Sequence, residues 1–407
     1  PIFPKRGCYL LDHLSVAGPG RLRDHAVNQV RATGAYQLGE RVNAAEHAVI
    51  EMPVSLVDDV IHQVAQHALA VFGRHDFEPI ERLALLNGLL GYFFAVVFLL
   101  CDLGQPWRLP YPMAVAFGPA AVLFLVAWHV ATYLSVQIAE VSVAFFEWIG
   151  WLGGKRFIRR IAIGLTVAGI ILSTLHQGAL GALFLYAPGK VHPLWFSAPF
   201  QWIFFFCSSI PAGLCMVIAV STVVKKTMAW RCDSNFLDNL DRCTLGIAKG
   251  ASMALITYLA IKLIGVAHDN EWGYLATGWG LWFLFEMAVA VVLPLCLFAY
   301  AIHNQRVGVA RLGAFITIFG IVLNRLNTSL ITFNWQLYQE IPHFFEVIMT
   351  LTVFCIYIVV YRFILYRLPI LFAWKEQPQE ALAAEAAKAA PVRTTVSPAG
   401  AMYRKID

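Results

Sequence analysis

Residues 200–224 read FQWIFFFCSSIPAGLCMVIAVSTVV and carry no charged side chain. A helix that crosses the hydrocarbon core of a bilayer needs about 20 mostly apolar residues, and this stretch is long enough. Strands of a membrane barrel alternate between apolar and polar positions in segments of about ten residues, whereas this run is apolar almost throughout. The stretch therefore predicts a transmembrane α-helix.

The whole chain has the composition of a membrane protein. Of its 407 residues, 59% are hydrophobic and 14% are charged, whereas soluble domains have roughly 25% charged residues. This composition excludes a secreted disulfide scaffold, a disordered chain and a nucleic-acid-binding protein. The net charge of +5 is too small to indicate a polyanionic partner, and membrane lipid is the expected surrounding.

Seven further stretches resemble 200–224 in length and apolarity. Together they predict an all-α, polytopic transmembrane helical bundle of about eight spans. The second stretch is longer than one crossing, so we expect its helix to be tilted or to extend beyond the bilayer. The predicted spans are residues 83–101, 112–147, 160–177, 200–224, 246–268, 274–302, 309–333 and 342–366.

Two polar segments flank the predicted bundle, which covers residues 74–372. Residues 1–73 contain no apolar window long enough to span a bilayer and are predicted to be an atypical cytoplasmic extension, partly helical around residues 54–72. Residues 373–407 are rich in Ala, Glu and Lys and then in Pro, Thr and Ser. Such a composition predicts a flexible tail.

Lysine and arginine gather in alternate loops of the predicted bundle. Clusters lie at residues 152–160 and 225–242, and further cations lie near both bundle termini, whereas the intervening loops hold little beyond Arg108 and Lys190. Cytoplasmic loops of membrane proteins carry the excess of Lys and Arg. We therefore expect both termini of the bundle to face the cytoplasm.

Ionisable side chains inside apolar stretches are costly in a membrane and so indicate candidate sites. Asp102 ends the first predicted helix and His176 comes late in the third, so both are expected near the outer face. Gln177 and Gly178 follow His176, which places hydrogen-bonding groups beside a residue that permits close backbone approach. We predict His176 as a ligand contact, with packing as the alternative; for His129, in mid-helix, packing comes first.

Three more ionisable residues fall on successive helices of the second half: Lys262, Glu286 and Arg325. An unpaired charge at that depth would be strongly unfavourable, so Glu286 is predicted to pair with Lys262 or Arg325. Such a cluster suits either a proton route or a structural lock. Glu140 lies in the inner half of the second helix, where it either guides protons inward or sits at a helix–helix contact.

Neither a metal site nor a haem is expected. The eight cysteines form no CxxC pair, and most lie in apolar stretches, where cysteine behaves as a small hydrophobe. We therefore predict no zinc, iron–sulfur or other metal site in this chain. A haem in a bundle needs two histidines at matching depth, and the sequence shows no spacing that pairs His129, His176 or His343.

Three motifs carry a family resemblance: CDLGQPWRLPYP (101–112), LHQGALGALFLYAPGKVHPLW (175–195) and NRLNTSLITFNW (324–335). With them, residues 71–371 resemble the membrane subunits of the NrfD/polysulfide reductase family, and most of all the HybB-type integral membrane subunit of nickel–iron hydrogenases. The resemblance implies a usually haem-free subunit of the bacterial inner membrane. It exchanges electrons between a periplasmic, ferredoxin-like iron–sulfur partner and menaquinone or ubiquinone, with hydrogenase, molybdopterin or multihaem cytochrome subunits as further partners.

The resemblance also implies a quinone pocket near the outer face. His176 would hydrogen-bond a quinone carbonyl and exchange protons, and Asp102 would orient His176 or relay protons outward. The remaining candidate residues are Trp107, Gln177, Gly178 and His129 around the quinone, and Glu140, Lys262, Glu286 and Arg325 on a proton path.

The chain departs from this family in three respects. Leu125 stands where HybB-type proteins generally carry a glutamate, and Lys262 stands where a relative has arginine. Relatives also have two more transmembrane helices before the VFGRHDF segment (71–77). We therefore hypothesise that residues 1–70 come from a shifted reading frame or misassembled upstream DNA. Resequencing that finds no alternative frame encoding two apolar helices would refute this.

Two alternatives to a quinone-reactive subunit stay open. Leu125 makes a passive membrane anchor, whose quinone chemistry is lost, more plausible. A secondary transporter would carry Gly- or Pro-interrupted helices in corresponding places of two repeats. Gly178 and Gly181 provide a candidate interruption in the first half, and the second half shows no matching one.

Overall fold

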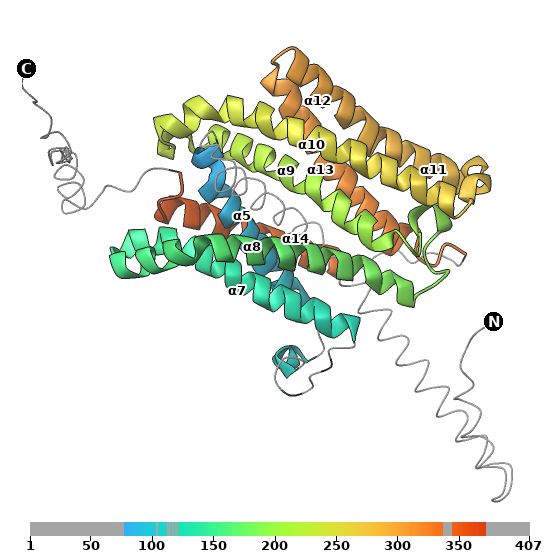
Figure 1. Ribbon diagram of the computed structural model, residues 1–407, viewed down its shortest axis with the longest axis horizontal. Helices are drawn as coiled ribbons and strands as arrows, with labels where there is room; N and C mark the ends of the chain where they lie inside the picture. The colour runs from blue at the N-terminus through green and yellow to red at the C-terminus, as the bar shows by residue number, and fades with distance from the viewer. Residues whose placement is uncertain are drawn as a thin grey trace, which may run out of the picture.

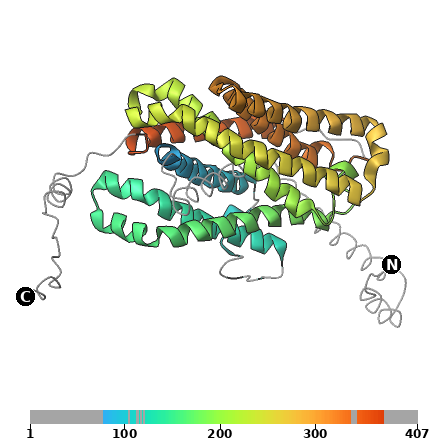
Figure 2. The same ribbon diagram turned by 45° about the horizontal axis from the view of Figure 1, so that its top comes forward.

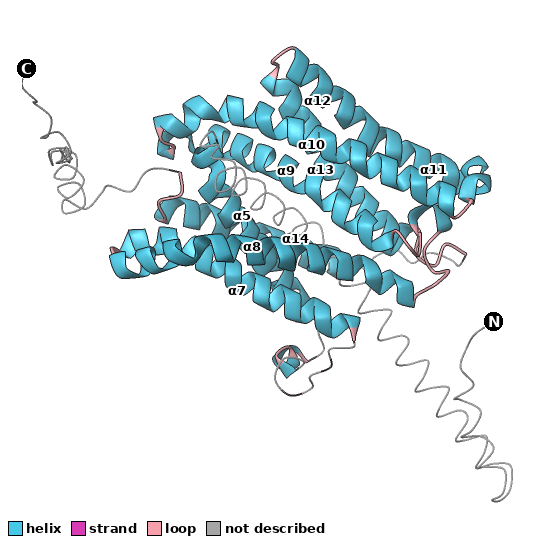
Figure 3. Cartoon of the chain, in the orientation of Figure 1, coloured by secondary structure: helices cyan, strands magenta, loops and turns pink. Residues whose placement is uncertain are grey.

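The structure, a computed structural model, describes residues 77–102, 105–111, 115, 118, 121–336 and 344–371. The predictions for residues 1–73 and 373–407 lie outside this part of the chain. Within the described residues the fold is helical (Figure 3), and the one strand-like pairing there is an antiparallel bridge between Val191 and Phe333.

Eight helices of the described chain are long and apolar enough to cross a membrane, which confirms the predicted all-α polytopic bundle. One of them is built from three consecutive segments, and another ends in a π-helical turn. In chain order they are α5 (Glu78–Asp102), α7 (Val122–Ile149), α8 (Leu152–Leu183), α9 (Gln201–Met228), α10 (Ser234–His268), α11–η7–α12 (Gly278–Met287, Ala288–Val292 and Leu293–His303), α13–η8 (Val307–Leu326 and Asn327–Ile331) and α14 (Phe344–Arg367).

The helices form two groups that pack side by side (Figures 1 and 2). Helices α5, α7, α8 and α14 make one group, and α9, α10, α12 and α13 make the other. Helix α9 joins the groups, because it packs against α8 and α5 on one side and against α10 and α13 on the other. This central place explains why α9 has the most buried apolar window of the eight.

Successive helices run in opposite directions, so their connections gather at two ends. We call one the basic end; it holds the turns after α7, α9 and α12 and the C-terminus of α14. Its cations are those that the sequence groups in alternate loops. The other, the loop end, holds residues 105–111, 184–200, 269–277 and 332–336.

Two predicted helix bounds are wrong at the α7–α8 hairpin. Helix α7 begins at Val122 rather than at residue 112, so its 28 residues fall between the 25 of α5 and the 32 of α8. Pro119 cannot donate a backbone hydrogen bond, and the helix begins after it. Helix α8 begins at Leu152 rather than at residue 160, because Gly150, with φ 77°, ends α7 in the left-handed conformation and turns the chain at once. The cations of residues 155–160 therefore lie on the first turns of α8.

A charge cluster fastens the basic end. Arg82 of α5 donates from Nη1 to Glu147 Oε2 of α7 at 2.8 Å and from Nη2 to Oε1 at 3.2 Å. Its Nη1 also donates to the carbonyl of Pro369 at 2.8 Å, and Lys155 of α8 lies 3.2 Å from Glu147. Paired N–H donors on one carboxylate give a strong, oriented contact, which ties three helices and the segment after α14 together.

Candidate functional sites

A polar cluster lies inside the first helix group, and we call it the histidine cluster: Tyr92 of α5, His129, Tyr133 and Gln137 of α7, and His176 and Gln177 of α8. The ring of Tyr92 packs against Tyr133, with centroids 4.7 Å apart, and against His176 at 5.6 Å. Gln137 donates to the hydroxyl of Tyr133 at 2.8 Å. His176 is only 4% exposed, and the aromatic ring of Tyr92 lies against it.

Several polar atoms of the histidine cluster are buried without a hydrogen-bond partner in the described part of the chain. They are His129 Nδ1, Gln137 Oε1, His176 Nδ1, and both Nε2 and Oε1 of Gln177. Buried polar groups are almost always hydrogen-bonded in native proteins, and unsatisfied ones call for a missing partner. The cluster therefore has unused donors and acceptors for a polar ligand or for water.

The two histidines of the cluster lie at the same depth. His129 comes seven residues after Val122 and His176 seven residues before Leu183, so each is about 10 Å from the loop end of its helix. The depths match only once the bounds of α7 and α8 are known, so spacing alone could not pair them. The absence of haem stays a prediction.

Helix α8 continues through the glycines that follow His176. Gly178 and Gly181 both lie within the helix, so the expected interruption is absent there. A Cβ on Gly181 would stand 2.8 Å from the carbonyl oxygen of Gln201 and 2.8 Å from Cα of Trp202, whereas Gly178 has only ordinary contacts. Gly181 thus permits α8 and α9 to approach closely, and the feature expected of a transporter is missing from α8.

The described part of the chain does not place the two remaining residues expected near a quinone, Asp102 and Trp107, beside His176. The backbone of α5 ends at Asp102, whose side chain lies outside the described residues. Trp107 lies on η2 (Pro106–Arg108) at the loop end and is 69% exposed. Among the described residues, its ring contacts no ring of the histidine cluster. The roles of both residues therefore stay predictions.

A second buried polar cluster, the carboxylate cluster, occupies the other helix group: Trp195, Lys262, Glu286, Asn324, Arg325 and Asn327. Glu286 of α11 is fully buried. Its carboxylate accepts hydrogen bonds from Trp195 Nε1 at 2.6 Å and from the side-chain amides of Asn324 and Asn327. These donors come from the loop-end segment η4 (Pro193–Trp195), from α13 and from η8, so the carboxylate fastens three parts of the chain.

The predicted ion pair of Glu286 with Lys262 or Arg325 is wrong. No ion pair within contact distance joins these residues in the described chain. Arg325 instead donates to the Phe205 carbonyl at 3.1 Å and to Ser208 Oγ at 2.6 Å, and it stacks 4.0 Å over the Phe205 ring. Neutral amide and indole groups donate the hydrogen bonds that Glu286 accepts, so neither cation is needed in direct contact with it.

The carboxylate cluster lies at nearly the same depth as the histidine cluster. Lys262 comes six residues before His268, Glu286 eight residues after Gly278, and Arg325 six residues before Ile331. At 1.5 Å per residue these positions are roughly 9–12 Å from the loop end. All three therefore lie in the loop-end half of their helices, and their predicted position in the outer half stays a prediction.

An aromatic enclosure around His192 connects the carboxylate cluster to the loop end. The His192 ring lies 4.7–5.8 Å, centroid to centroid, from the rings of Trp195, Tyr274, Trp279 and Trp335. Its Nδ1 accepts from the backbone N–H of Leu194 at 3.2 Å, and its backbone N–H donates to the carbonyl of Thr332. Burial lowers the pKa of His192 from 6.5 to about 4, so the ring is neutral at pH 7.

Acidification is expected to destabilise the bundle through His192. Because its pKa is lower in the folded state, the unfolded chain binds an extra proton between about pH 6.5 and about pH 4. The stability that the neutral ring contributes is complete above about pH 6.5 and is lost progressively as the pH falls towards 4. Thermal unfolding at a series of pH values should give a flatter profile for His192→Phe than for the wild type. His303→Ala, exposed at the basic end, should keep the wild-type profile, and an unchanged profile in His192→Phe would contradict this assignment.

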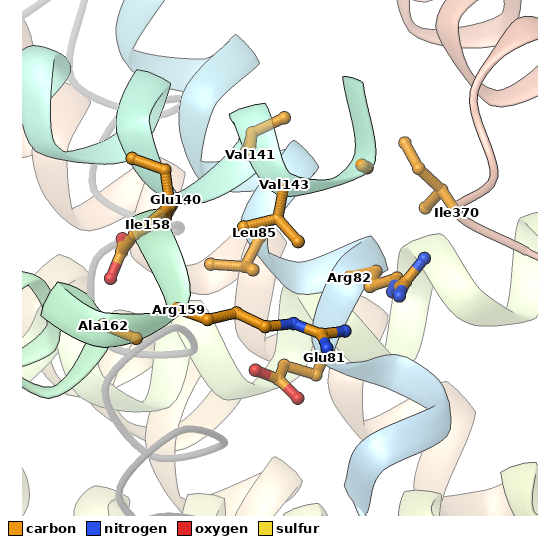
Figure 4. A pocket seen from close by; sticks show the side chains of 11 residues that line it. Glu81, Arg82, Leu85, Glu140, Val141, Val143, Ile158, Arg159, Ala162 and Ile370 are labelled. Atoms are coloured by element: carbon orange, nitrogen blue, oxygen red, sulfur yellow. The ribbon is translucent and has the colours of Figure 1, made fainter. Parts of the chain in front are cut away.

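Glu140 lines a cavity (Figure 4), and it stands further along α7 towards the basic end than the histidine cluster does. The cavity has a volume of about 280 Å³ between α5, α7 and α8. Its lining includes Glu81, Arg82 and Arg159 besides Glu140, with apolar side chains between them. Glu140 is 6% exposed, and Thr166 of α8 lies 3.5 Å from its Oε1. Glu140 is therefore both a helix–helix contact and part of the wall of a largely apolar cavity that carries four charged side chains.

Sequence reasoning missed several residues of both clusters. Tyr92, Tyr133 and Gln137 lie outside the quoted motifs. An aromatic or amide residue in an apolar stretch is ordinarily interpreted as a packing residue. Trp195 and Asn327 did stand inside the quoted motifs, but only as marks of resemblance. The polar content of NRLNTS within an apolar stretch is the signal that could have drawn attention to Asn324 and Asn327.

Fold and composition together define a multi-pass membrane protein with two buried polar clusters near one end of its bundle. The chain belongs to the NrfD polysulphide reductase family, whose model matches residues 63–334. This match confirms the resemblance seen in the motifs.

Three relatives are similar over most of the matched region. A protein of Nitratidesulfovibrio vulgaris is 44% identical over 305 residues, which cover 74% of this chain and 78% of that protein. The probable Ni/Fe-hydrogenase 2 b-type cytochrome subunit of Escherichia coli is 26% identical over 307 residues, 75% of this chain and 77% of its own. The integral membrane subunit of a menaquinone reductase of N. vulgaris is 25% identical over 273 residues, 60% of this chain and 62% of its own.

Proposed function

We propose that this chain is the quinone-reactive membrane subunit of a respiratory oxidoreductase complex. The observation that carries the proposal is the set of unpartnered buried polar atoms around His176. A quinone ring needs an apolar slot and hydrogen-bond partners for its carbonyls, and His176 with Gln177 offers both a ring and amide groups. The names of a hydrogenase subunit and a menaquinone reductase subunit among the relatives support the same reading.

In this proposal His176 hydrogen-bonds one carbonyl of menaquinone or ubiquinone and exchanges its proton. An imidazole suits that task because its ordinary pKa is near neutrality. Gln177, Gly178 and His129 border the ring, and Asp102 orients His176 or relays protons to the aqueous phase, with Trp107 near the opening. Electrons pass to or from an iron–sulfur subunit docked on the loop end, and that subunit connects to a hydrogenase, molybdopterin or multihaem cytochrome partner.

The basic end faces the cytoplasm in this proposal, and the loop end faces the periplasm of a bacterial inner membrane. The gathering of Lys and Arg at the basic end supports this orientation. It places the iron–sulfur partner on the periplasmic side, beside both polar clusters.

A proton path is a further part of the proposal. In this proposal the cavity beside Glu140 holds water among its charged side chains. Glu140 then receives protons from the basic end through that water. Lys262, Glu286 and Arg325 supply a second group of ionisable side chains at the depth of His176. Together they would couple quinone turnover to movement of charge.

Replacing His176 by alanine is expected to lower quinone-dependent electron transfer by about 100-fold, the usual contribution of a positioned acid–base group. The measurement is the turnover of the purified complex with a soluble quinone or quinol, and also the amount of quinone retained per chain. His303→Ala is the control, because that histidine is exposed at the basic end. Full activity of His176→Ala would remove His176 from the quinone site.

A passive membrane anchor is the second candidate function. Leu125 favours it, because this residue lies one turn before His129 on α7 and brings no carboxylate to the histidine cluster. A passive anchor would hold the complex on the membrane yet bind no quinone. The amount of quinone retained per chain separates the two functions. A quinone-reactive subunit should retain less quinone in His176→Ala than in the wild type, whereas an anchor should show no difference.

A further inference from the structure

The orientation of its donors fixes Glu286 as a carboxylate. The indole of Trp195 can only donate, and it donates to Oε2. The oxygen of Asn327 accepts from the indole of Trp282 at 3.0 Å, so its amide nitrogen is the group that faces Oε2. A proton on Oε2 would therefore have two donors against it.

The other oxygen of Glu286 is constrained in the same way. Asn324 directs its amide nitrogen to Oε1, while its oxygen faces Nη1 of Arg325 at 3.5 Å. Turning the amide of Asn324 round, so that it could accept from a protonated Oε1, would set its nitrogen against the guanidinium. These contacts favour the carboxylate form of Glu286.

Arg325 supplies the matching positive charge. A guanidinium stays protonated in proteins, and Arg325 is 1% exposed, stacked on Phe205 and bonded to Ser208. Its charge and that of Glu286 cancel within the carboxylate cluster. The other buried ionisable side chains nearby, Tyr258 and Cys207, are ordinarily neutral at pH 7.

Lys262 has no such compensation. Its side chain is 3% exposed, and among the described residues no carboxylate lies within ion-pair distance and no acceptor hydrogen-bonds its ammonium. Its Nζ stands 4.3 Å from the centre of the Phe204 ring, which Gly265, one turn further along α10, allows to approach. A charged Lys262 would leave the cluster with one positive charge in excess, deep in the bundle, and such a charge is costly.

We propose that Lys262 is the exchangeable proton site of the carboxylate cluster, between fixed charges on Glu286 and Arg325. Its neutral amine takes up a proton on the Nζ lone pair to give an ammonium and returns the same proton to water or to the next group. The face of Phe204 stabilises the ammonium while it exists. The protonation states follow from the contacts alone, whereas the use of this exchange in proton transfer rests on the proposed function.

The test is nuclear magnetic resonance of the full chain in lipid nanodiscs, with the lysine side-chain nitrogens labelled with ¹⁵N. The Lys262 signal is assigned as the one that Lys262→Arg removes. We expect it to move from the ammonium to the amine position at a lower pH than an unperturbed lysine, whose pKa is about 10.4. An ammonium signal that persists up to the pH at which an unperturbed lysine titrates would overturn the proposal.

Infrared difference spectroscopy over the same pH range tests the fixed charge. No carbonyl band of a protonated carboxylic acid should disappear in Glu286→Gln, and its disappearance would make Glu286 the exchanging group instead. Lys262→Met should fold as stably as the wild type, whereas removal of a permanently charged, unpaired lysine would make the variant more stable than the wild type. None of these measurements uses quinone. If Lys262 still titrates in His176→Ala, the proton site holds even where the quinone site has failed. If Lys262 does not titrate, the proposal for a quinone site at His176 is unaffected.

Discussion

Glu286→Leu is expected to destabilise the folded chain by about 3–5 kcal/mol, the cost of removing one partner of a buried charge network. The substitution leaves the guanidinium of Arg325 buried without a counter-charge. It also deprives the indole of Trp195 and the amides of Asn324 and Asn327 of their acceptor. The measurement is the free energy of unfolding in mixed detergent micelles, followed by tryptophan fluorescence.

A double variant separates the charge from the packing. Glu286→Leu combined with Arg325→Leu removes both charges, so it should recover part of the loss. Glu346→Leu is the control, because Glu346 is exposed in the first turn of α14, and its stability should be close to that of the wild type. If the double variant were less stable than Glu286→Leu by the full free-energy cost of Arg325→Leu alone, the two charges would not be coupled.

Gly320→Leu is expected to destabilise the chain by about 3 kcal/mol through overpacking and to reduce activity as well. A Cβ on Gly320 would stand 2.3 Å from Cβ and 2.6 Å from Cα of Ala290, so backbone must move to admit it. Ala290 belongs to the π-helical segment that follows Glu286, and Gly320 lies one turn before Asn324. Forcing the helices apart would therefore draw Asn324 away from Glu286.

Gly308→Leu is the matched control, because Gly308 lies on the same helix and a Cβ there would meet nothing within 4 Å. Its stability should equal or slightly exceed that of the wild type, since leucine favours a helix more than glycine does. Equal stability of Gly320→Leu and Gly308→Leu, measured by thermal unfolding, would show that α13 and the π-helical segment can separate at no cost.

The fold could be predicted because bilayer thickness and continuous apolarity determine where membrane helices lie. The stretch at 200–224 is an example, and α9 extends it only to Gln201–Met228. Hydropathy does not set the ends of helices. The cations of residues 155–160 lower the hydropathy of the first turns of α8, although this stretch is helical. The apolar residues before Val122 raise the hydropathy of a stretch that precedes the start of α7.

The candidate sites could be predicted in part, because buried ionisable residues stand out in an apolar sequence. His176, Lys262, Glu286 and Arg325 were found this way, but their partners were not. Charge arithmetic paired Glu286 with a cation, whereas the folded chain satisfies it with the neutral donors Trp195, Asn324 and Asn327. Hydrogen bonds between side chains distant in sequence depend on helix rotation, which composition does not encode.

The position of a bound quinone tests most directly whether His176 belongs to a quinone site. A cryo-electron microscopy structure of the complete complex in nanodiscs with a menaquinone analogue would locate the ring. We expect the ring within hydrogen-bond distance of His176 or Gln177, with Tyr92 beside it. A ring bound elsewhere, while His176 stays packed against Tyr92 as it is here, would contradict this expectation.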